Sequence, residues 1–453
     1  MSTTNVARIG VIGVGYVGLV TATALAELGH HVRCIDIDAA KIERLRACEV
    51  PFFEPGLEEA VRAQSPRLHF TADIAHALEG VDLAFVCVDT PPSPSGHADL
   101  SRVESVIDSI PAGAALTLVM KSTVPVGTGA RLQRRLHARG LIDIAYASNP
   151  EFLREGCALA DVRNPDRIVV GATDPEAAER IIDLWAPLGG KLLVTDVASA
   201  EMIKLAANAF LATKISFINE IANVCEAVGA DATLVAEGMG ADHRIGSAFL
   251  KPGVGFGGSC FGKDVNALKQ AAANVGYHFH LLSGVLEVNA LQKRRPVWVL
   301  EQRLGSLHGR RIAVLGLAFK PGTDDMRDAP SLLLISALTG TGAVVVAHDP
   351  VAAANARRLL PDAVAIVDTI DEAITGADAV IVVTEWPEYK ELLSASLAEL
   401  PRRPLLVDGR NCLDPDDAIA VGWEYVGVGR PLMSTPIDLS RVDEIVDLLA
   451  DAC

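Results

Sequence analysis

One cysteine lies in a glycine-rich loop near the middle of the chain, with a cation and a carboxylate close behind it. Cys260 follows the three glycines of residues 255–258, and Lys263 and Asp264 come three and four residues later. Glycines let a backbone approach a ligand closely, and a lysine beside a thiol stabilises the nucleophilic thiolate. Cys260 is therefore a candidate nucleophile that could hold an acyl group. The alternative is a small buried hydrophobic residue, which is what most free cysteines are.

A dinucleotide-binding fingerprint precedes this loop in the chain. Gly13, Gly15 and Gly18 form a Gly-x-Gly-x-x-Gly pattern between a predicted strand at 7–13 and a predicted helix at 19–28. In such a turn the first glycine makes the tight bend and the second admits a pyrophosphate. The third lets the helix pack closely on the strand.

Asp36 indicates which dinucleotide this fingerprint favours. It ends the next predicted strand, at 31–35, about 20 residues after the glycines, where an acidic residue accepts hydrogen bonds from ribose hydroxyls. Because its charge disfavours a 2′-phosphate, the prediction is NAD and not NADP. A glycine-rich turn without a ligand is the remaining alternative.

Two more predicted strands, at 81–88 and 115–120, end in polar turns that contain Thr90 and Thr123. Ligands of open α/β sheets bind beyond the carboxyl ends of the strands, so both threonines are placed to touch the cofactor. Either threonine could instead be a helix cap or a turn residue. The residues themselves leave both interpretations open.

The centre of the chain predicts one long helix. Residues 199–229 contain no proline and no interior glycine, and their apolar side chains recur at helical spacing. Such a helix would connect two domains and pair with a second copy in a homodimer. Lys204 and Asn208 lie on one helix face and could offer an ammonium and an amide N–H to an oxyanion. Lys204 could instead be a surface lysine whose stem covers apolar neighbours.

The last third of the chain repeats the strand pattern of the first, but a longer loop containing Lys320 replaces the glycine fingerprint. The predicted fold class is therefore α/β, with two Rossmann-like, doubly wound parallel-sheet domains joined by a long central helix. We expect an NAD-binding domain, a helical dimerisation region with the cysteine loop, and a nucleotide-sugar-binding domain, at residues 1–198, 199–300 and 301–453.

Composition excludes several function classes. A chain of 453 residues exceeds what one hydrophobic core usually supports, so more than one domain is expected. A net charge of −17 argues against nucleic acid as a partner. The eight cysteines are scattered without close pairs, which favours a reducing compartment and argues against disulfides and metal sites. No apolar run is long enough for a membrane span, and the first residues show no signal peptide. A cytoplasmic protein without membrane contact is expected.

Taken together, the motifs resemble the UDP-glucose/GDP-mannose 6-dehydrogenase family over nearly the whole chain. The matching segments are residues 13–18, 51–57, 121–128, 149–156, 201–208, 244–246, 249–253, 255–264, 316–320 and 324–327. The resemblance implies an NAD-dependent enzyme that oxidises the C6 alcohol of a nucleotide sugar to a carboxylate. The segment before Cys260, and Phe261 after it, are more similar to the UDP-glucose branch than to the GDP-mannose branch.

The resemblance also implies a covalent mechanism. Cys260 would add to a first-formed aldehyde to give a thiohemiacetal, which a second NAD would oxidise to a thioester. Water would then hydrolyse the thioester, so that each sugar yields two NADH. The catalytic residues implied are Cys260, Lys204, Asn208, Asp264, Glu151 and Thr123, with Lys204 and Asn208 stabilising the oxyanion and Glu151 or Asp264 acting as the base.

The same resemblance implies two sets of binding residues. Those for NAD are Gly13, Gly15, Tyr16, Val17, Gly18, Asp36, Lys41, Thr90, Thr123, Glu155, Lys263 and Arg327. Those for the nucleotide sugar, expected between the domains, are Glu151, Phe152, Leu153, Arg154, Glu155, Lys204, Asn208, Arg244, Phe249, Leu250, Lys251, Pro252, Gly253, Gly257 and Lys320.

Two positions depart from the family pattern. Gly262 stands where the family usually has proline. Without the proline ring the unfolded loop has more conformational freedom, which should lower the stability of the folded loop by about 0.4–1 kcal/mol. Asp89 replaces a glycine and adds negative charge near the expected cofactor. Alternative substrates are dTDP-glucose, GDP-mannose and a UDP-N-acetyl sugar. A non-catalytic nucleotide-sugar-binding protein is disfavoured, because the Cys260, Lys204, Asn208 and Asp264 set is intact.

Overall fold

The computed structural model describes residues 6–93 and 98–431, and the chain divides into two compact units. Unit 1 runs to Phe210 and also contains Gly258–Ser283 and Pro321–Asp324. Unit 2 contains Leu211–Gly257, Gly284–Lys320 and the chain from Asp325 onward. The predicted boundaries of three regions stay a prediction. The interpretation of the first five residues as lacking a signal peptide lies outside the described residues.

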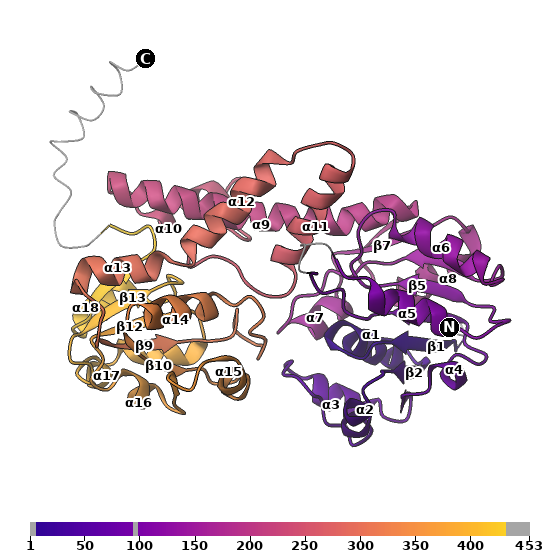
Figure 1. Cartoon of the computed structure of the whole chain (residues 1–453), viewed down its shortest axis with the longest axis horizontal. Helices are drawn as coiled ribbons and strands as arrows, with labels where there is room; N and C mark the ends of the chain where they lie inside the picture. Colours follow the sequence, from indigo (N-terminus) through magenta and orange to yellow (C-terminus); the bar gives the residue numbers. More distant parts are fainter. Residues whose placement is uncertain (1–5, 94–97, 432–453) are drawn as a thin grey trace, which may run out of the picture. The chain divides into compact units, whose positions relative to one another are not determined.

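Unit 1 is built on an eight-stranded sheet in the order β3-β2-β1-β4-β5-β6-β7-β8 (Figure 1). Its strands are β1 Arg8–Ile12, β2 His31–Ile35, β3 Leu68–Thr71, β4 Leu83–Val86, β5 Thr117–Met120, β6 Ala145–Ser148, β7 Arg167–Ala172 and β8 Lys191–Thr195. Neighbouring strands are parallel except β6 and β7, which pair antiparallel. The strand order reverses between β1 and β4, and such a switch point is where ligands bind in open α/β sheets.

Helices pack on both faces of this sheet. Along β4, Leu83 and Phe85 belong to one apolar core while Ala84 and Val86 belong to the other, as alternating side chains of a doubly covered strand require. The helices whose residues lie in unit 1 are α1 Tyr16–Glu27, α2 Ala39–Arg46, α3 Leu57–Ala63, α4 Ile74–Ala77, α5 Ser101–Ser109, α6 Thr128–Ala138, α7 Ala158–Arg163, α8 Pro175–Trp185, η1 Ala186–Leu188 and α11 Phe261–Asn274.

Unit 2 contains a six-stranded, wholly parallel sheet in the order β11-β10-β9-β12-β13-β14. The strands are β9 Arg311–Leu315, β10 Val344–His348, β11 Ala365–Ile366, β12 Ala379–Val382, β13 Leu405–Asp408 and β14 Glu424–Gly427. The helices are α10 Ala232–Gly240, α13 Arg295–Leu304, α14 Pro330–Gly340, α15 Ala353–Leu359, α16 Ile370–Ile374, η2 Pro387–Leu393, α17 Ala395–Ala398 and α18 Pro415–Ala420. Helix α12, His280–Gln292, begins in unit 1 and ends in unit 2.

The long central helix is α9, Val197–Val228, within two residues of the predicted bounds. Because α9 continues from one unit into the other, the predicted fold class of two Rossmann-like domains joined by a long helix is confirmed. The antiparallel β6–β7 pair is the one departure from the predicted parallel sheets.

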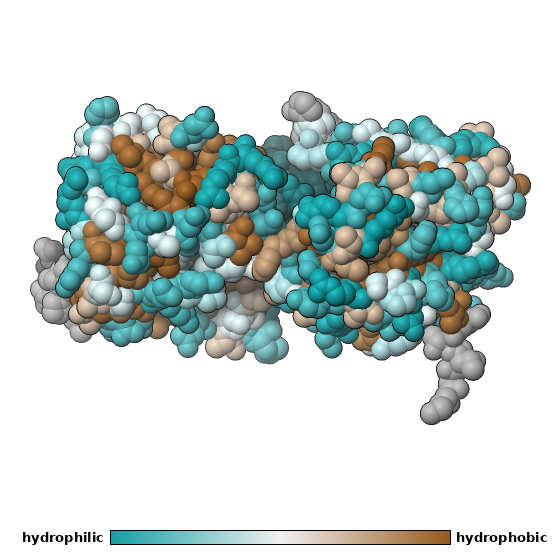
Figure 2. Space-filling view, turned by 90° about the horizontal axis from the view of Figure 1, so that it is seen from below, coloured by the Kyte–Doolittle hydropathy of each residue, from teal (hydrophilic) through white to brown (hydrophobic). Residues whose placement is uncertain are grey.

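Several general features can be stated for the described residues. Their seven cysteines are free thiols, and they include no helix long and apolar enough to cross a membrane. In the same ranges, no group of three or more metal-ligating side chains is placed to hold a metal ion. Figure 2 shows one face of the molecule, on which polar and charged side chains surround scattered apolar groups.

Candidate active site

The glycine fingerprint forms the turn between β1 and α1. Gly13 has φ 90°, and a Cβ there would lie 2.9 Å from the Val88 nitrogen. A Cβ at Gly18 would lie 1.8 Å from the Gly13 carbonyl oxygen, so that position requires glycine for close packing. A Cβ at Gly15 would meet nothing within 4 Å, so this N-cap residue of α1 borders open space. The turn therefore fits a pyrophosphate at the start of the helix.

Asp36 is buried beside this turn at the carboxyl end of β2. Its Oδ2 accepts hydrogen bonds from the Val14 amide at 3.0 Å and from the Lys41 ammonium at 2.8 Å, and its Oδ1 accepts from the Asp38 amide at 3.0 Å. Since a carboxylate can accept about four hydrogen bonds, one acceptor position remains for a ribose hydroxyl. The arrangement fits NAD.

We therefore expect Asp36→Asn to weaken NAD binding and to narrow the preference for NAD over NADP by about 10- to 100-fold, because like charges at close range cost several kcal/mol. The same change frees Lys41 from its ion pair, so its ammonium can face a 2′-phosphate. Binding of NAD and NADP measured by fluorescence quenching checks this result. Equal binding of both dinucleotides by the unmodified protein would show that Asp36 does not face the ribose.

The two threonine turns contact each other. The Thr90 hydroxyl donates to the Thr123 carbonyl at 2.8 Å, and the Lys263 ammonium lies 3.4 Å from the same hydroxyl. Thr90 therefore links the two turns, and a contact with the cofactor stays a prediction for both threonines. The Asp89 carboxylate forms an ion pair with Arg102 at the start of α5, so the extra charge near this turn has a partner.

Cys260 is the N-cap of α11, which places its thiol at the end of the glycine-rich loop. Lys263 and Asp264 lie in the first helical turn, and the Asp264 amide donates to the Cys260 carbonyl at 2.8 Å. Gly262 lies inside this turn, where the first-turn backbone of a helix also accepts proline. The departure from the family pattern therefore falls on a regular helix and not on an irregular loop.

Lys204 is buried on α9, with 4 % of its surface exposed, so it is not a surface lysine. Its ammonium lies 2.8 Å from Glu151 Oε1, and Glu151 Oε2 accepts from the Leu153 amide at 2.5 Å. Burial alone would lower the pKa of Lys204, but the Glu151 and Asp264 carboxylates raise it above its ordinary value. Lys204 is thus a buried lysine whose ammonium is paired with the Glu151 carboxylate.

One helical turn further along α9, Asn208 Nδ2 donates to Asp264 Oδ2 at 2.6 Å. The other oxygen of Asp264 accepts from the Lys263 ammonium at 2.7 Å, and only 1 % of this residue is exposed. Lys204 and Asn208 therefore each hold one carboxylate, and each keeps further N–H donors, since an ammonium has three and an amide two.

The groups around the Cys260 thiol act on its pKa in both directions. The residue is exposed, yet the protein atoms around the thiol raise its pKa above the ordinary value. The Lys204 ammonium lowers this pKa, while the Glu151 and Asp264 carboxylates raise it. Lys263, the lysine nearest to Cys260 in the sequence, forms an ion pair with Asp264.

The structure thus brings the predicted catalytic residues together in unit 1: Cys260, Lys204, Asn208, Asp264, Glu151 and Thr123. The predicted NAD residues also belong to unit 1 except Arg327, which lies in unit 2 and pairs with Asp325 at 2.7 Å. The predicted sugar-nucleotide residues are divided. Those in unit 2 are Arg244, Phe249, Leu250, Lys251, Pro252, Gly253, Gly257 and Lys320.

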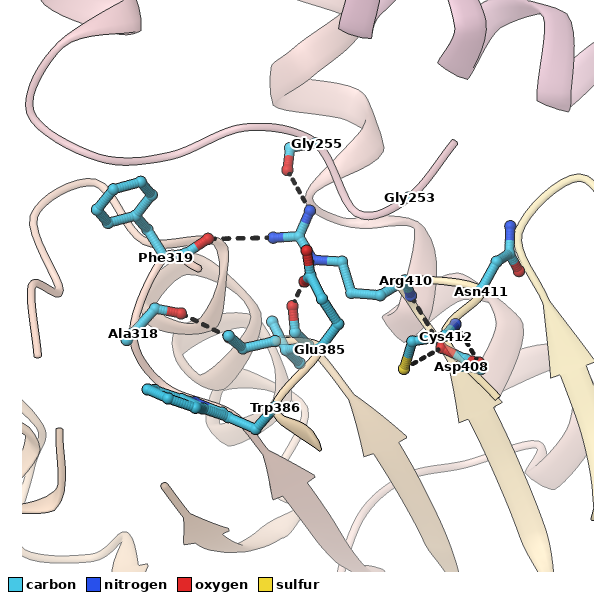
Figure 3. A network of polar contacts seen from close by, with 12 residues as sticks. Gly253, Gly255, Ala318, Phe319, Glu385, Trp386, Asp408, Arg410, Asn411 and Cys412 are labelled. Atoms are coloured by element: carbon cyan, nitrogen blue, oxygen red, sulfur yellow. Dashed lines mark hydrogen bonds and ion pairs between the residues drawn. The ribbon is translucent and has the colours of Figure 1, made fainter. Parts of the chain in front are cut away.

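Arg410 lies two residues after the end of β13 and was not among the site residues predicted from the sequence. Its guanidinium donates to the carbonyls of Val383 at 2.7 Å, Gly255 at 3.1 Å and Phe319 at 3.4 Å, and it lies 3.3 Å from the Glu385 carboxylate. Figure 3 shows the side chain reaching the loop before Cys260 and the loop before Lys320. Arg410 therefore fixes two segments that carry predicted substrate residues.

Asp349 occupies the place in unit 2 that Asp36 occupies in unit 1. Its carboxylate accepts from the Leu317 and Ala318 amides, from Trp386 Nε1 at 3.0 Å and from two amides of the following turn. Five donors fill the acceptor positions of one carboxylate. Asp349 is therefore a structural residue. The strand pattern of the first third of the chain is repeated in the last third, but the ribose-binding role expected of Asp36 is not.

Comparisons with known proteins agree over most of the chain. Three models of the UDP-glucose/GDP-mannose dehydrogenase family match: the NAD binding domain at residues 7–189, the central domain at 198–291 and the UDP binding domain at 313–415. The UDP-glucose 6-dehydrogenase YwqF of Bacillus subtilis is 49 % identical over 429 residues, 93 % of this chain and 98 % of that protein.

Two further similarities extend this result. A UDP-glucose 6-dehydrogenase of Pseudomonas aeruginosa is 45 % identical over 446 residues, 94 % of this chain and 98 % of that protein. The solved structure of a UDP-glucose dehydrogenase from Pyrobaculum islandicum is 40 % identical, with a TM-score of 0.89 over 95 % of this chain and 99 % of that one.

Proposed function

The chain belongs to the UDP-glucose/GDP-mannose dehydrogenase family and is an NAD-dependent oxidoreductase, and we propose that it oxidises UDP-glucose at C6 to UDP-glucuronate. The names of its relatives at 45 % and 49 % identity support this substrate. The observation that carries the proposal is the position of Cys260 beside two buried pairs, Lys204 with Glu151 and Asn208 with Asp264.

In this proposal NAD, when bound, supplies the hydride acceptor for both oxidations. The residues proposed to hold it are those of the glycine turn, Asp36 and Lys41, together with Thr90, Thr123, Glu155, Lys263 and Arg327. The Gly13–Gly18 turn accommodates the pyrophosphate, and the remaining acceptor position of Asp36 takes a ribose hydroxyl.

The first oxidation gives an aldehyde at C6, and the thiol of Cys260 then adds to this carbon. A C–S bond forms, the thiol proton moves to the former carbonyl oxygen, and a thiohemiacetal results. The free donors of Lys204 and Asn208 stabilise the negative charge that develops on this oxygen. Binding of the aldehyde as a thiol adduct prevents its escape before the second oxidation.

The second oxidation removes the C6 hydride and the hydroxyl proton, which leaves a thioester. Water attacks the thioester carbon, the C–S bond breaks, and Cys260 is recovered as a thiol together with the carboxylate product. We propose Glu151 as the base, since 8 % of this residue is exposed against 1 % of Asp264. Burial alone would raise the pKa of Glu151, but Lys204, the Leu153 amide and Lys121 together lower it, which keeps the carboxylate ionised.

We propose that the nucleotide end of the substrate is held by residues of both loops that Arg410 fixes, among them Gly253, Gly257 and Lys320, and also by Arg244.

A screen of initial rates of NADH formation with UDP-glucose, dTDP-glucose, GDP-mannose and UDP-N-acetylglucosamine tests the substrate. We expect UDP-glucose to give the highest kcat/KM by at least about tenfold, the scale on which one pocket contact discriminates. A higher value for any of the others would overturn the substrate but not the reaction class.

We also propose that the enzyme is a cytoplasmic homodimer formed through α9. The exposed apolar side chains of α9 in the single chain include Phe210 by 65 %, Phe217 by 47 %, Val224 by 56 % and Val228 by 64 %. The first three recur every seven residues, which places them on one helix face, and such exposed apolar stripes mark interfaces. Sedimentation of the unmodified protein as a monomer at micromolar concentration would contradict the dimer.

A further inference from the structure

One buried cation near the candidate active site has no role in the reaction described so far. Lys121 directly follows β5, and Asn149 directly follows the neighbouring strand β6. Because Met120 pairs with Ser148 in the parallel ladder, the next residues of the two strands begin side by side. Both Lys121 and Asn149 are buried, and Asn149 is two residues before Glu151.

Both polar atoms of the Asn149 side-chain amide form hydrogen bonds. Its Oδ1 accepts from the Lys121 ammonium and from Trp185 Nε1, each at 3.1 Å, and its Nδ2 donates to the Val169 carbonyl at 2.8 Å. The Lys121 ammonium also lies 3.4 Å from the Asn149 main-chain carbonyl and 5.1 Å from the centre of the Trp185 ring. These contacts fix the backbone at the start of the segment that carries Glu151.

We propose that Lys121 is a positioning residue for the Glu151 carboxylate: it holds Asn149 in place and adds a second buried positive charge near this carboxylate. The proposal rests on the proposed function, in which Glu151 activates the water that releases the product. Lys121 acts through Asn149 and through its charge, and does not touch the reacting atoms.

The electrostatics of the surrounding groups are consistent with this role. Burial lowers the pKa of Lys121 to about 8. Cys87 and Glu151 raise this pKa, and Lys204 lowers it further. Lys121 is also among the groups that keep the pKa of Glu151 below its ordinary value, after the larger effect of Lys204. The charged and titratable groups that interact with Glu151 are Lys204 and Lys121, and also Tyr16, Cys87 and Cys260.

Three variants separate the charge of Lys121 from its hydrogen bonds. Lys121→Met removes both and fills the space, while Lys121→Gln keeps an N–H donor toward Asn149 and removes the charge. Trp185→Phe is the matched control, because it removes the other hydrogen bond to Asn149 Oδ1 without changing any charge. The titration of Glu151 is followed by carboxylate infrared difference spectra against Glu151→Gln, without substrate or cofactor, and kcat is measured against pH with NAD and UDP-glucose.

We expect both Lys121 variants to raise the apparent pKa of Glu151 by about one unit, the lower end of the effect of a nearby opposite charge. Because activity requires the ionised carboxylate and is lost as pH falls through its pKa, the acidic limb of the kcat profile should move to higher pH by the same amount. At the optimum, kcat of Lys121→Met should fall by about 10- to 30-fold through misplacement of the base. Trp185→Phe should leave the pKa unchanged.

An unshifted Glu151 titration in both Lys121 variants, or an equal shift in Trp185→Phe, would overturn the proposal. If Lys121→Met does not fold, Lys121→Gln carries the same test. The infrared titration needs no substrate, so it tests the role of Lys121 even if the protein does not oxidise UDP-glucose. Failure of the unmodified protein to form NADH with UDP-glucose would count against the proposed function alone.

Discussion

Replacement of Cys260 by alanine is expected to abolish formation of the carboxylate product, with a loss of at least about 10⁴-fold, the scale of removing a nucleophile. The reason is that the thiol forms and breaks the only covalent bond between the chain and the substrate in the proposed mechanism. NAD and UDP-glucose should still bind, because the thiol is not among the proposed binding groups. Chromatography of the uronic acid and calorimetry of ligand binding check the two results.

The unmodified enzyme should form two NADH for each uronic acid, with no aldehyde released. Cys157→Ala is a matched control, since Cys157 is a second exposed thiol of unit 1 and should be dispensable for turnover. A ratio of one NADH for each sugar, with aldehyde accumulating in solution, would contradict the covalent mechanism. Equal loss of activity in the Cys157 variant would show that the assay reports general thiol damage.

Features encoded in short segments could be predicted from the sequence. The turn around Gly13 and the carboxylate of Asp36 follow from a strand, a helix and a second strand that are consecutive in the chain. The bounds of α9 could be predicted for the same reason, because a segment without proline or interior glycine, with apolar residues at helical spacing, identifies a helix locally.

Contacts between distant segments could not be predicted in the same way. Asn208 and Asp264 are 56 residues apart in the sequence, so helical spacing placed Lys204 and Asn208 on one face without showing what covers that face. A surface position for Lys204 was therefore an open alternative until the buried ion pair with Glu151 excluded it. Sequence proximity to Lys263 likewise does not show that Asp264 accepts from its ammonium, so the thiolate form of Cys260 stays a prediction.

Arg410 is a different case, because the apolar run at residues 405–407 shortly before it is a usable strand signal. Polar residues at the carboxyl ends of parallel strands are candidates for a ligand site, and this rule singled out Thr90 and Thr123. Applied to the second sheet, it would also have indicated Arg410. Its three carbonyl partners are more than 25 residues away in the chain, so its bracing role depends on the folded structure.

Lys204→Met is expected to lower kcat by about 10²- to 10³-fold, as loss of one oxyanion donor typically does. The raised pKa of Lys204 keeps its ammonium charged, so the unmodified residue stabilises negative charge and does not act as a base. Asn208→Ala should have a smaller effect, because an amide offers a dipole and not a full charge. The double variant should lose less than the two separate losses combined, since both groups act on one oxygen. Steady-state kinetics of the three variants checks these results.

The buried pair with Glu151 requires a control for stability. Lys204→Met leaves the Glu151 carboxylate buried without its partner, which is expected to destabilise the fold by about 3–5 kcal/mol. The double variant Lys204→Met, Glu151→Gln removes both charges, so it should regain much of this stability in urea unfolding. Because Glu151 is also the proposed base, this variant is a control for stability alone and not for activity. If Lys204→Met is folded, binds substrate and keeps full turnover, Lys204 only maintains the fold, and another group stabilises the oxyanion.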